Sequence, residues 1–194
     1  MIVLSLLFAA AAGHTARLPT PEEKAAESAF RACPGGETLA NTITMSWTPL
    51  TGAIVRHRAI RERQHLDFPE SGDRILLHSL TMDRATAERS VVASRRADGV
   101  WHVDEAGQDL SRYPVGALPH KAYDLSVEES RHVDALLEDP CLYASPRFIM
   151  PKKPSASGAA QRLEIVTSEH QAVLGWFSER TPAEDALVKL IARD

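Results

Sequence analysis

Hydrophobic residues recur at helical spacing in three segments, and each segment begins with the same capping pattern. In this pattern a Ser or Thr is followed three residues later by a Glu. The Ser or Thr side chain accepts a hydrogen bond from the backbone amide of the Glu, and the Glu side chain accepts one from the backbone amide of the Ser or Thr. The pairs are Thr20 with Glu23, Ser126 with Glu129, and Thr181 with Glu184. Pro follows the first and third caps, where its missing N–H costs nothing. The pattern predicts helices over 21–32, 127–138 and 182–192.

Between the first two helices, apolar and polar residues alternate in the way that is typical of half-buried strands. Strands are predicted over 42–48, 75–82, 88–95 and 100–104, and a further pair over 162–167 and 171–177. Asp98 and Gly99 stand between the third and fourth strands and predict a hairpin, because Asp-Gly favours a tight turn. The connections are short, which favours antiparallel pairing.

Three stretches carry weaker signals. Residues 53–68 show neither a clean helical nor a clean strand period, and we interpret them as a strand. Residues 105–123 and 145–160 are rich in Pro, Gly, Ser and other small residues, which predicts two long surface loops. The whole pattern predicts an α+β fold in which an antiparallel sheet of five to seven strands is covered on one face by two or three helices.

Residues 1–16 have the composition of a signal peptide, because an apolar run is followed by small residues and no charge precedes Arg17. The run is shorter than the roughly 20 apolar residues of a membrane span, and a retained anchor is the alternative. Cleavage after Gly13 fits the usual small residues better than cleavage after Ala16. We expect one exported domain over 17–194, periplasmic or secreted, with no transmembrane span in the mature chain.

Cys33 and Cys141 are the only cysteines in the chain. Export would place them in a compartment where disulfides persist, so we predict that they pair and that the bond joins the ends of the first two predicted helices. A reactive thiol at Cys33 is the alternative, but the segment has neither a CxxC partner nor an adjacent base.

Composition limits the classes of function. The 194 residues are 44% hydrophobic and carry 22 basic against 26 acidic residues. This near balance supplies no field for nucleic acid, so no nucleic-acid partner is expected. Enrichment in Ala and Arg suggests a bacterial source through codon bias. The sequence contains no P-loop, dinucleotide-binding glycine pattern, nucleophile elbow or zinc motif, and no cofactor is expected.

His102 and Asp104 form the most specific candidate for a metal site. Residues two apart on a strand share a face, and in non-haem iron oxygenases such a pair is completed by a distant His, a role that His170 could take. The apolar members of this strand are Trp101 and Val103, however. We therefore expect His102 and Asp104 to face solvent and expect no bound metal.

A second copy of the same triplet, at His132 and Asp134, falls in a predicted helix. Two residues of a helix are turned by about 200° relative to each other, so these side chains point apart and cannot chelate one ion. Since one copy arises without a metal-binding role, the triplet by itself is weak evidence for the other.

Two further pairs are candidates for binding. Arg61 and Arg63 belong to the densest positive stretch and would share one face of a strand, where they could dock an anionic polymer or lipid head group. A solvated face paired with acidic neighbours is the alternative. Trp101 and Trp176 lie in predicted strands, where large aromatics usually fill the core. If one face of the sheet is open, they would form an apolar ligand wall.

These features favour an exported, non-catalytic binding domain of the cell envelope whose ligand or protein partner is not specified. The alternative is an enzyme with a dispersed acid/base site, with hydrolysis as the favoured reaction, or a metal-dependent site built on His102, Asp104 and His170. A purely structural role is the third hypothesis. A deep pocket that gathers titratable groups would favour the enzyme.

Overall fold

The computed structural model describes residues 19–50, 52, 54–68, 74–81, 87–152, 160–177 and 179–192. Its helices are α1 (Pro21–Ala32), α2 (Gly36–Thr42), α3 (Ile54–Arg63), α4 (Val127–Leu137), α5 (Pro140–Tyr143) and α6 (Pro182–Ile191). Its strands are β1 (Ile43–Ser46), β2 (Arg74–Thr81), β3 (Ala87–Arg95), β4 (Trp101–Asp109), β5 (Gly116–Ala117), β6 (Lys121–Asp124), β7 (Phe148–Pro151), β8 (Ala160–Thr167) and β9 (Gln171–Trp176).

The three predicted capping boxes all form, and they begin α1, α4 and α6. At the start of α1 the Thr20 hydroxyl accepts from the Glu23 amide at 3.2 Å, and the Thr20 amide donates to the Glu23 carboxylate at 2.8 Å. This confirms the three predicted helices, because local side-chain chemistry fixes where each one begins.

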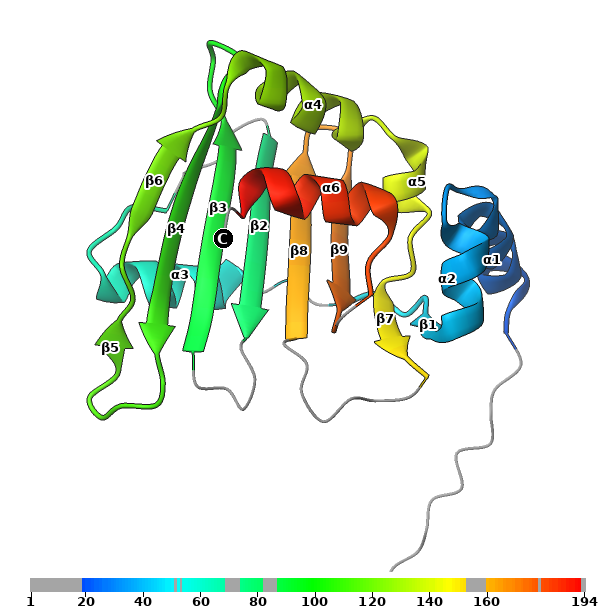
Figure 1. Cartoon of the computed structure of the whole chain (residues 1–194), viewed down its shortest axis with the longest axis horizontal. Coiled ribbons are helices and arrows are strands. Elements are labelled where there is room, and N and C mark those ends of the chain that lie inside the picture. Colours follow the sequence, from blue (N-terminus) through cyan, green and yellow to red (C-terminus); the bar gives the residue numbers. More distant parts are fainter. Residues whose placement is uncertain are drawn as a thin grey trace, which may run out of the picture.

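The described strands form one nine-stranded sheet in the order β1-β7-β9-β8-β2-β3-β4-β5, with β6 also paired to β4 (Figure 1). All pairs are antiparallel except β7 with β9. The predicted α+β class is confirmed. The strands β5, β6 and β7 lie in segments predicted as loops, so the loop predictions are wrong there. Strands of two to four residues are too short to show an alternating pattern.

The Asp-Gly hairpin is confirmed between β3 and β4. Gly99 adopts φ 85°, a left-handed conformation that suits glycine. The strand β4 runs five residues past its predicted end because residues up to Asp109 continue to pair with β3. The second predicted hairpin, between β8 and β9, is also confirmed.

The main core lies between the sheet and the helices α4 and α6, which cover one face (Figure 1). Trp101 and Trp176 are fully buried there, with 0% of their surface exposed. The indole N–H of Trp101 donates to Asp134 of α4 at 3.0 Å. Both Trp residues therefore fill the core and do not form an open apolar ligand wall.

The helix α3 lies on the opposite face of the sheet (Figure 1), in the segment interpreted as a strand. That interpretation is wrong, and the buried residues explain why. They are His57, Ile60 and Arg61, which follow the i, i+3, i+4 spacing of one helix face. Because two of the three are polar, a search for hydrophobic periodicity does not detect the face.

The predicted disulfide between Cys33 and Cys141 is present, with a Cα–Cα distance of 5.7 Å. Cys33 is the C-terminal cap of α1, and Cys141 lies in α5 just after α4. The bond therefore ties the N-terminal helices to the helical layer over the sheet. A structural disulfide of this kind is typical of proteins that fold in an oxidising compartment.

Glu184 is the acidic member of the capping box at the start of α6, and it is fully buried, with 0% of its surface exposed. Its carboxylate accepts from the Ser145 hydroxyl and from the Thr181 amide, each at 2.7 Å. Burial raises the pKa of Glu184, although these two hydrogen bonds and the charge of Arg180 oppose the shift.

This raised pKa predicts a pH-dependent loss of stability. Between the ordinary Glu pKa of about 4.3 and the raised pKa, the unfolded chain releases a proton that the folded protein keeps, so stability falls as the pH rises. Relative to Glu184→Gln, the wild type should lose up to about 1.4 kcal/mol per pH unit in this window, measured by urea denaturation. Glu129→Gln changes the same capping position at the exposed start of α4 and should keep this fall in stability.

Candidate binding site

The face of the sheet under α3 carries polar side chains at alternate positions of its strands. Ser90 of β3, Asp104 and Gln108 of β4, and Glu164 of β8 lie on this face, and all four are buried or half-buried. The neighbouring residues in each strand, such as Val91 and Val103, point into the main core. The sheet therefore has one apolar face and one polar face, and α3 covers part of the polar one.

Polar contacts hold α3 against this face. Arg61 Nη1 lies 2.8 Å from Asp104 Oδ1, and Arg61 Nε donates to the Asp67 carbonyl at 2.6 Å. His57 Nδ1 lies 2.7 Å from Ser90 Oγ. Since the side chain of Arg61 is only 4% exposed, this ion pair joins helix and sheet away from bulk water.

The pKa of Asp104 reports on the same contact. Burial alone would raise this pKa, but the hydrogen bond and charge of Arg61, together with those of His120, bring it below its usual range. His120 Nε2 lies 3.2 Å from Asp104 Oδ1. The carboxylate therefore remains ionised and paired at neutral pH.

A cleft of about 560 Å³ opens between α3 and the polar face of the sheet, and we call it the arginine cleft. Three guanidinium groups from two elements line it, with one carboxylate among the described lining residues. The charged and amide members are Arg56 and Arg63 of α3, Arg162 of β8, Glu88 of β3 and Gln108 of β4. The cleft is open to solvent and has a net positive lining, so its chemistry suits an anion.

A chain of contacts positions two of these arginines. Arg56 Nη1 lies 3.3 Å from Glu88 Oε1, Gln108 Nε2 donates to Glu88 Oε2 at 2.7 Å, and Arg63 Nη1 donates to Gln108 Oε1. Glu88 and Gln108 are directly paired across β3 and β4 and are at most 9% exposed. The two guanidinium groups are therefore held in place by a buried pair of polar side chains on the sheet.

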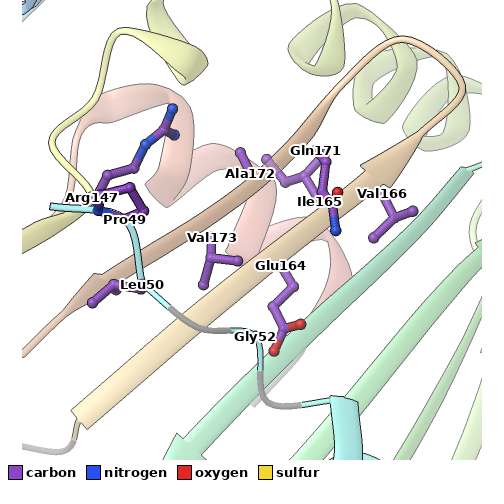
Figure 2. A pocket seen from close by; sticks show the side chains of 10 residues that line it. All are labelled: Pro49, Leu50, Gly52, Arg147, Glu164, Ile165, Val166, Gln171, Ala172 and Val173. Atoms are coloured by element: carbon purple, nitrogen blue, oxygen red, sulfur yellow. The ribbon is translucent and has the colours of Figure 1, made fainter. Parts of the chain in front are cut away.

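A second hollow, of about 310 Å³, adjoins the cleft and is lined in part by Pro49, Leu50 and Gly52 (Figure 2). Its walls are mostly apolar and include Leu50, Val166 and Val173. Figure 2 shows the Glu164 side chain directed toward Gly52, which lines both hollows. A Cβ at Gly52 would lie 2.5 Å from Glu164 Oε2, so any larger residue there would require the Glu164 carboxylate to shift.

The HxD pair does not form a joint site. His102 and Asp104 share the face opposite Trp101, as the alternation predicts, but they turn to different partners. His102 Nδ1 lies 2.7 Å from Asp124 Oδ1, whereas Asp104 pairs with Arg61. Asp104 is covered by α3, so the expectation that it faces solvent is wrong.

His170 lies apart from the HxD pair. It is in the turn between β8 and β9, where its ring packs on Tyr143 with 4.2 Å between ring centroids. Two strands separate β8 from β4, which places them about 14 Å apart across the sheet. Among the described residues, no group of three or more His, Cys, Asp or Glu side chains is arranged to hold a metal ion.

The two arginines expected to share a strand face have different environments on the helix. Arg61 is buried against Asp104, while Arg63 is exposed and lines the arginine cleft. Of these two candidates, the structure brings only Arg63 to an accessible hollow. Arg56 belongs to the same positive stretch but was not singled out from it. Sequence reasoning missed Arg162 and the pair of Glu88 with Gln108, which come together only through the sheet register. The alternating polar residues of β3 and β4 are the one signal that could have indicated them.

The close pair of His57 and Ser90 resembles a catalytic dyad in its residue types, but neither residue is accessible. They are 1% and 0% exposed and line neither hollow. A nucleophile must reach a substrate carbonyl, which this serine cannot do. The pair therefore attaches α3 to the sheet, and the geometry gives no support to hydrolysis at this position.

The fold and the cleft define an α+β protein, tied by one disulfide, with an arginine-lined hollow on the polar face of its sheet. Comparison with protein-family models, with characterised proteins and with solved structures gives no significant match. In the part of the chain that the structure describes, none of the helices is both long and apolar enough to cross a membrane.

Proposed function

We propose that this protein is an exported, non-catalytic binding domain of the cell envelope that takes an anionic ligand in the arginine cleft. The observation that carries the proposal is the convergence of Arg56, Arg63 and Arg162 on one cleft, where Glu88 is the one carboxylate among the described lining residues. Guanidinium groups bind carboxylates and phosphates through charge-assisted hydrogen bonds. The disulfide and the signal-like composition of residues 1–16, which lie outside the described residues, support export.

Native mass spectrometry of the protein purified from its own host tests both parts of the proposal. The mature N-terminus should correspond to cleavage near Gly13 or Ala16, and a co-purified ligand should be anionic. An uncleaved N-terminus would contradict export, and a cationic or neutral ligand would contradict the chemistry of the cleft.

Calorimetric titration with phosphate, sulfate and citrate at low salt should detect anion binding. Arg63→Gln should weaken the affinity about tenfold or more, the usual effect of losing a hydrogen bond to a charged group. Affinity should also fall as salt rises, because ions screen exposed charges. Arg131→Gln is the matched control, since Arg131 is an exposed arginine on α4, over the opposite face. Equal losses in both variants would contradict a site in the cleft.

A further inference from the structure

Arg56 and Arg63 are spaced to hold two anionic groups at once. They are seven positions apart on α3, so their Cα atoms are separated by two helical turns, about 10.5 Å along the axis. Both line the same cleft, so they lie on one flank of the helix. Arg56 is held by Glu88 and Arg63 by Gln108, so two anionic groups on one ligand can each contact a different guanidinium.

The two guanidinium groups are held in place before any ligand arrives. Arg56 contacts the Glu88 carboxylate, and Arg63 donates to the Gln108 carbonyl oxygen, while Glu88 and Gln108 bond to each other. Each of these contacts engages one terminal nitrogen of its arginine, and a guanidinium carries five N–H donors. The other donors can bind a ligand at a low entropic cost because the side chains are already ordered.

The lining between the two arginines is apolar. Ala59 and Ile60 lie between Arg56 and Arg63 in the helix, and both line the cleft, as does Val55. The middle of a ligand that joins the two arginines would therefore contact methyl and methylene groups. An apolar linker fits these contacts better than a hydroxylated or charged one.

The charge of the lining sets the charge of the ligand. Three arginines and one glutamate among the described lining residues give a net charge of +2. Arg162 lies on β8, which is nearer in the sheet to β3 than to β4. Arg56 contacts Glu88 of β3 and Arg63 contacts Gln108 of β4, so Arg162 is on the Arg56 side of the cleft. An anionic ligand is therefore favoured, and Arg56 and Arg63 offer a guanidinium to each of two anionic groups.

We infer that the arginine cleft binds an elongated dianion, an α,ω-dicarboxylate with an apolar chain, whose ends contact Arg56 and Arg63. The Cα spacing of Arg56 and Arg63 gives the scale of the ligand, about 10 Å, while the long side chains set where the guanidinium groups lie. Dicarboxylates from succinate to dodecanedioate bracket this scale. The inference rests on the proposed anion-binding function and specifies its ligand class.

Calorimetric titration of the oxidised protein with succinate, adipate, azelate and dodecanedioate tests this inference. Affinity should rise with length to a maximum at one of the longer dicarboxylates. Nonanoate, a monocarboxylate with the same chain length, should bind about tenfold or more weakly, since it lacks one charged contact. Arg56→Gln should remove the difference between azelate and nonanoate. Arg58→Gln, on the same helix but packed over Phe68 with 5.0 Å to the ring centroid, should preserve it.

The outcomes separate the inference from the proposed function. If phosphate or citrate binds but azelate is no tighter than nonanoate, the dianion is ruled out and anion binding stands. If none of these anions binds, both proposals fail. Arg56 is suited to this test because its side chain is 60% exposed, and circular dichroism of the variant checks that the fold is intact.

Discussion

Replacing Cys33 and Cys141 together with Ser is expected to lower the free energy of unfolding by about 4 to 5 kcal/mol. The two residues are 108 positions apart, and a cross-link that closes a loop of this size removes much of the freedom of the unfolded chain. Urea denaturation should show a lower midpoint. The slope should also rise, because the unfolded variant expands and exposes more surface.

The reduced wild-type protein is the control for this experiment. It keeps both sulfur atoms and should unfold at the same urea concentration as the double variant. A reduced protein as stable as the oxidised one would show that the loop is already constrained without the bond.

Asp104→Asn is expected to destabilise the protein by about 3 kcal/mol at neutral pH. The substitution leaves the buried Arg61 guanidinium without its counter-charge, and an uncompensated buried charge is the costly part of a broken ion pair. Asp124→Asn is a matched control, because Asp124 also contacts one Arg and one His but is exposed. It should cause little or no change in urea denaturation, since exposed ion pairs contribute little.

The lowered pKa of Asp104 adds a pH test to the same variant. Because Arg61 and His120 stabilise the ionised carboxylate against burial, its contribution to stability is complete above the ordinary Asp pKa of about 3.9. It is lost as the pH falls through the lowered value. The difference between wild type and Asp104→Asn should therefore shrink in acid, and a constant difference would contradict the ion-pair explanation.

The elements with local chemical signals were predictable. The capping boxes at Thr20, Ser126 and Thr181 indicated three helices, and the Asp-Gly turn indicated the β3–β4 hairpin. In each case residues within a few positions of one another determine the geometry. The disulfide was predictable for another reason, since two cysteines allow only one pairing.

The segment of α3 was predicted incorrectly because its buried face is polar. His57 and Arg61 are buried only because Ser90 and Asp104 of the sheet satisfy them. Those partners are 33 and 43 positions away in the sequence. No local pattern shows that such partners will be present, so the segment could not be distinguished from a strand.

The candidate site could be predicted only in part. The arginine-rich stretch was identified as an anion-binding hypothesis, and Arg63 does line the cleft. Arg61 turned out to be a buried ion-pair partner, and His170 lies far from His102 and Asp104. The contribution of Arg162 and of the Glu88–Gln108 pair depends on the register of β3, β4 and β8.

The sequence by itself determined the α+β class, the starts of three helices, two hairpins and the cysteine pair. The first three depend on residues close together in the sequence, and two cysteines allow only one pairing. Only the tertiary structure decided that α3 is a helix lying on a polar sheet face and that Arg162 of β8 shares one cleft with Arg56 and Arg63. The physical reason is that burying a charge requires a partner, and the partners here come from strands far away in the chain.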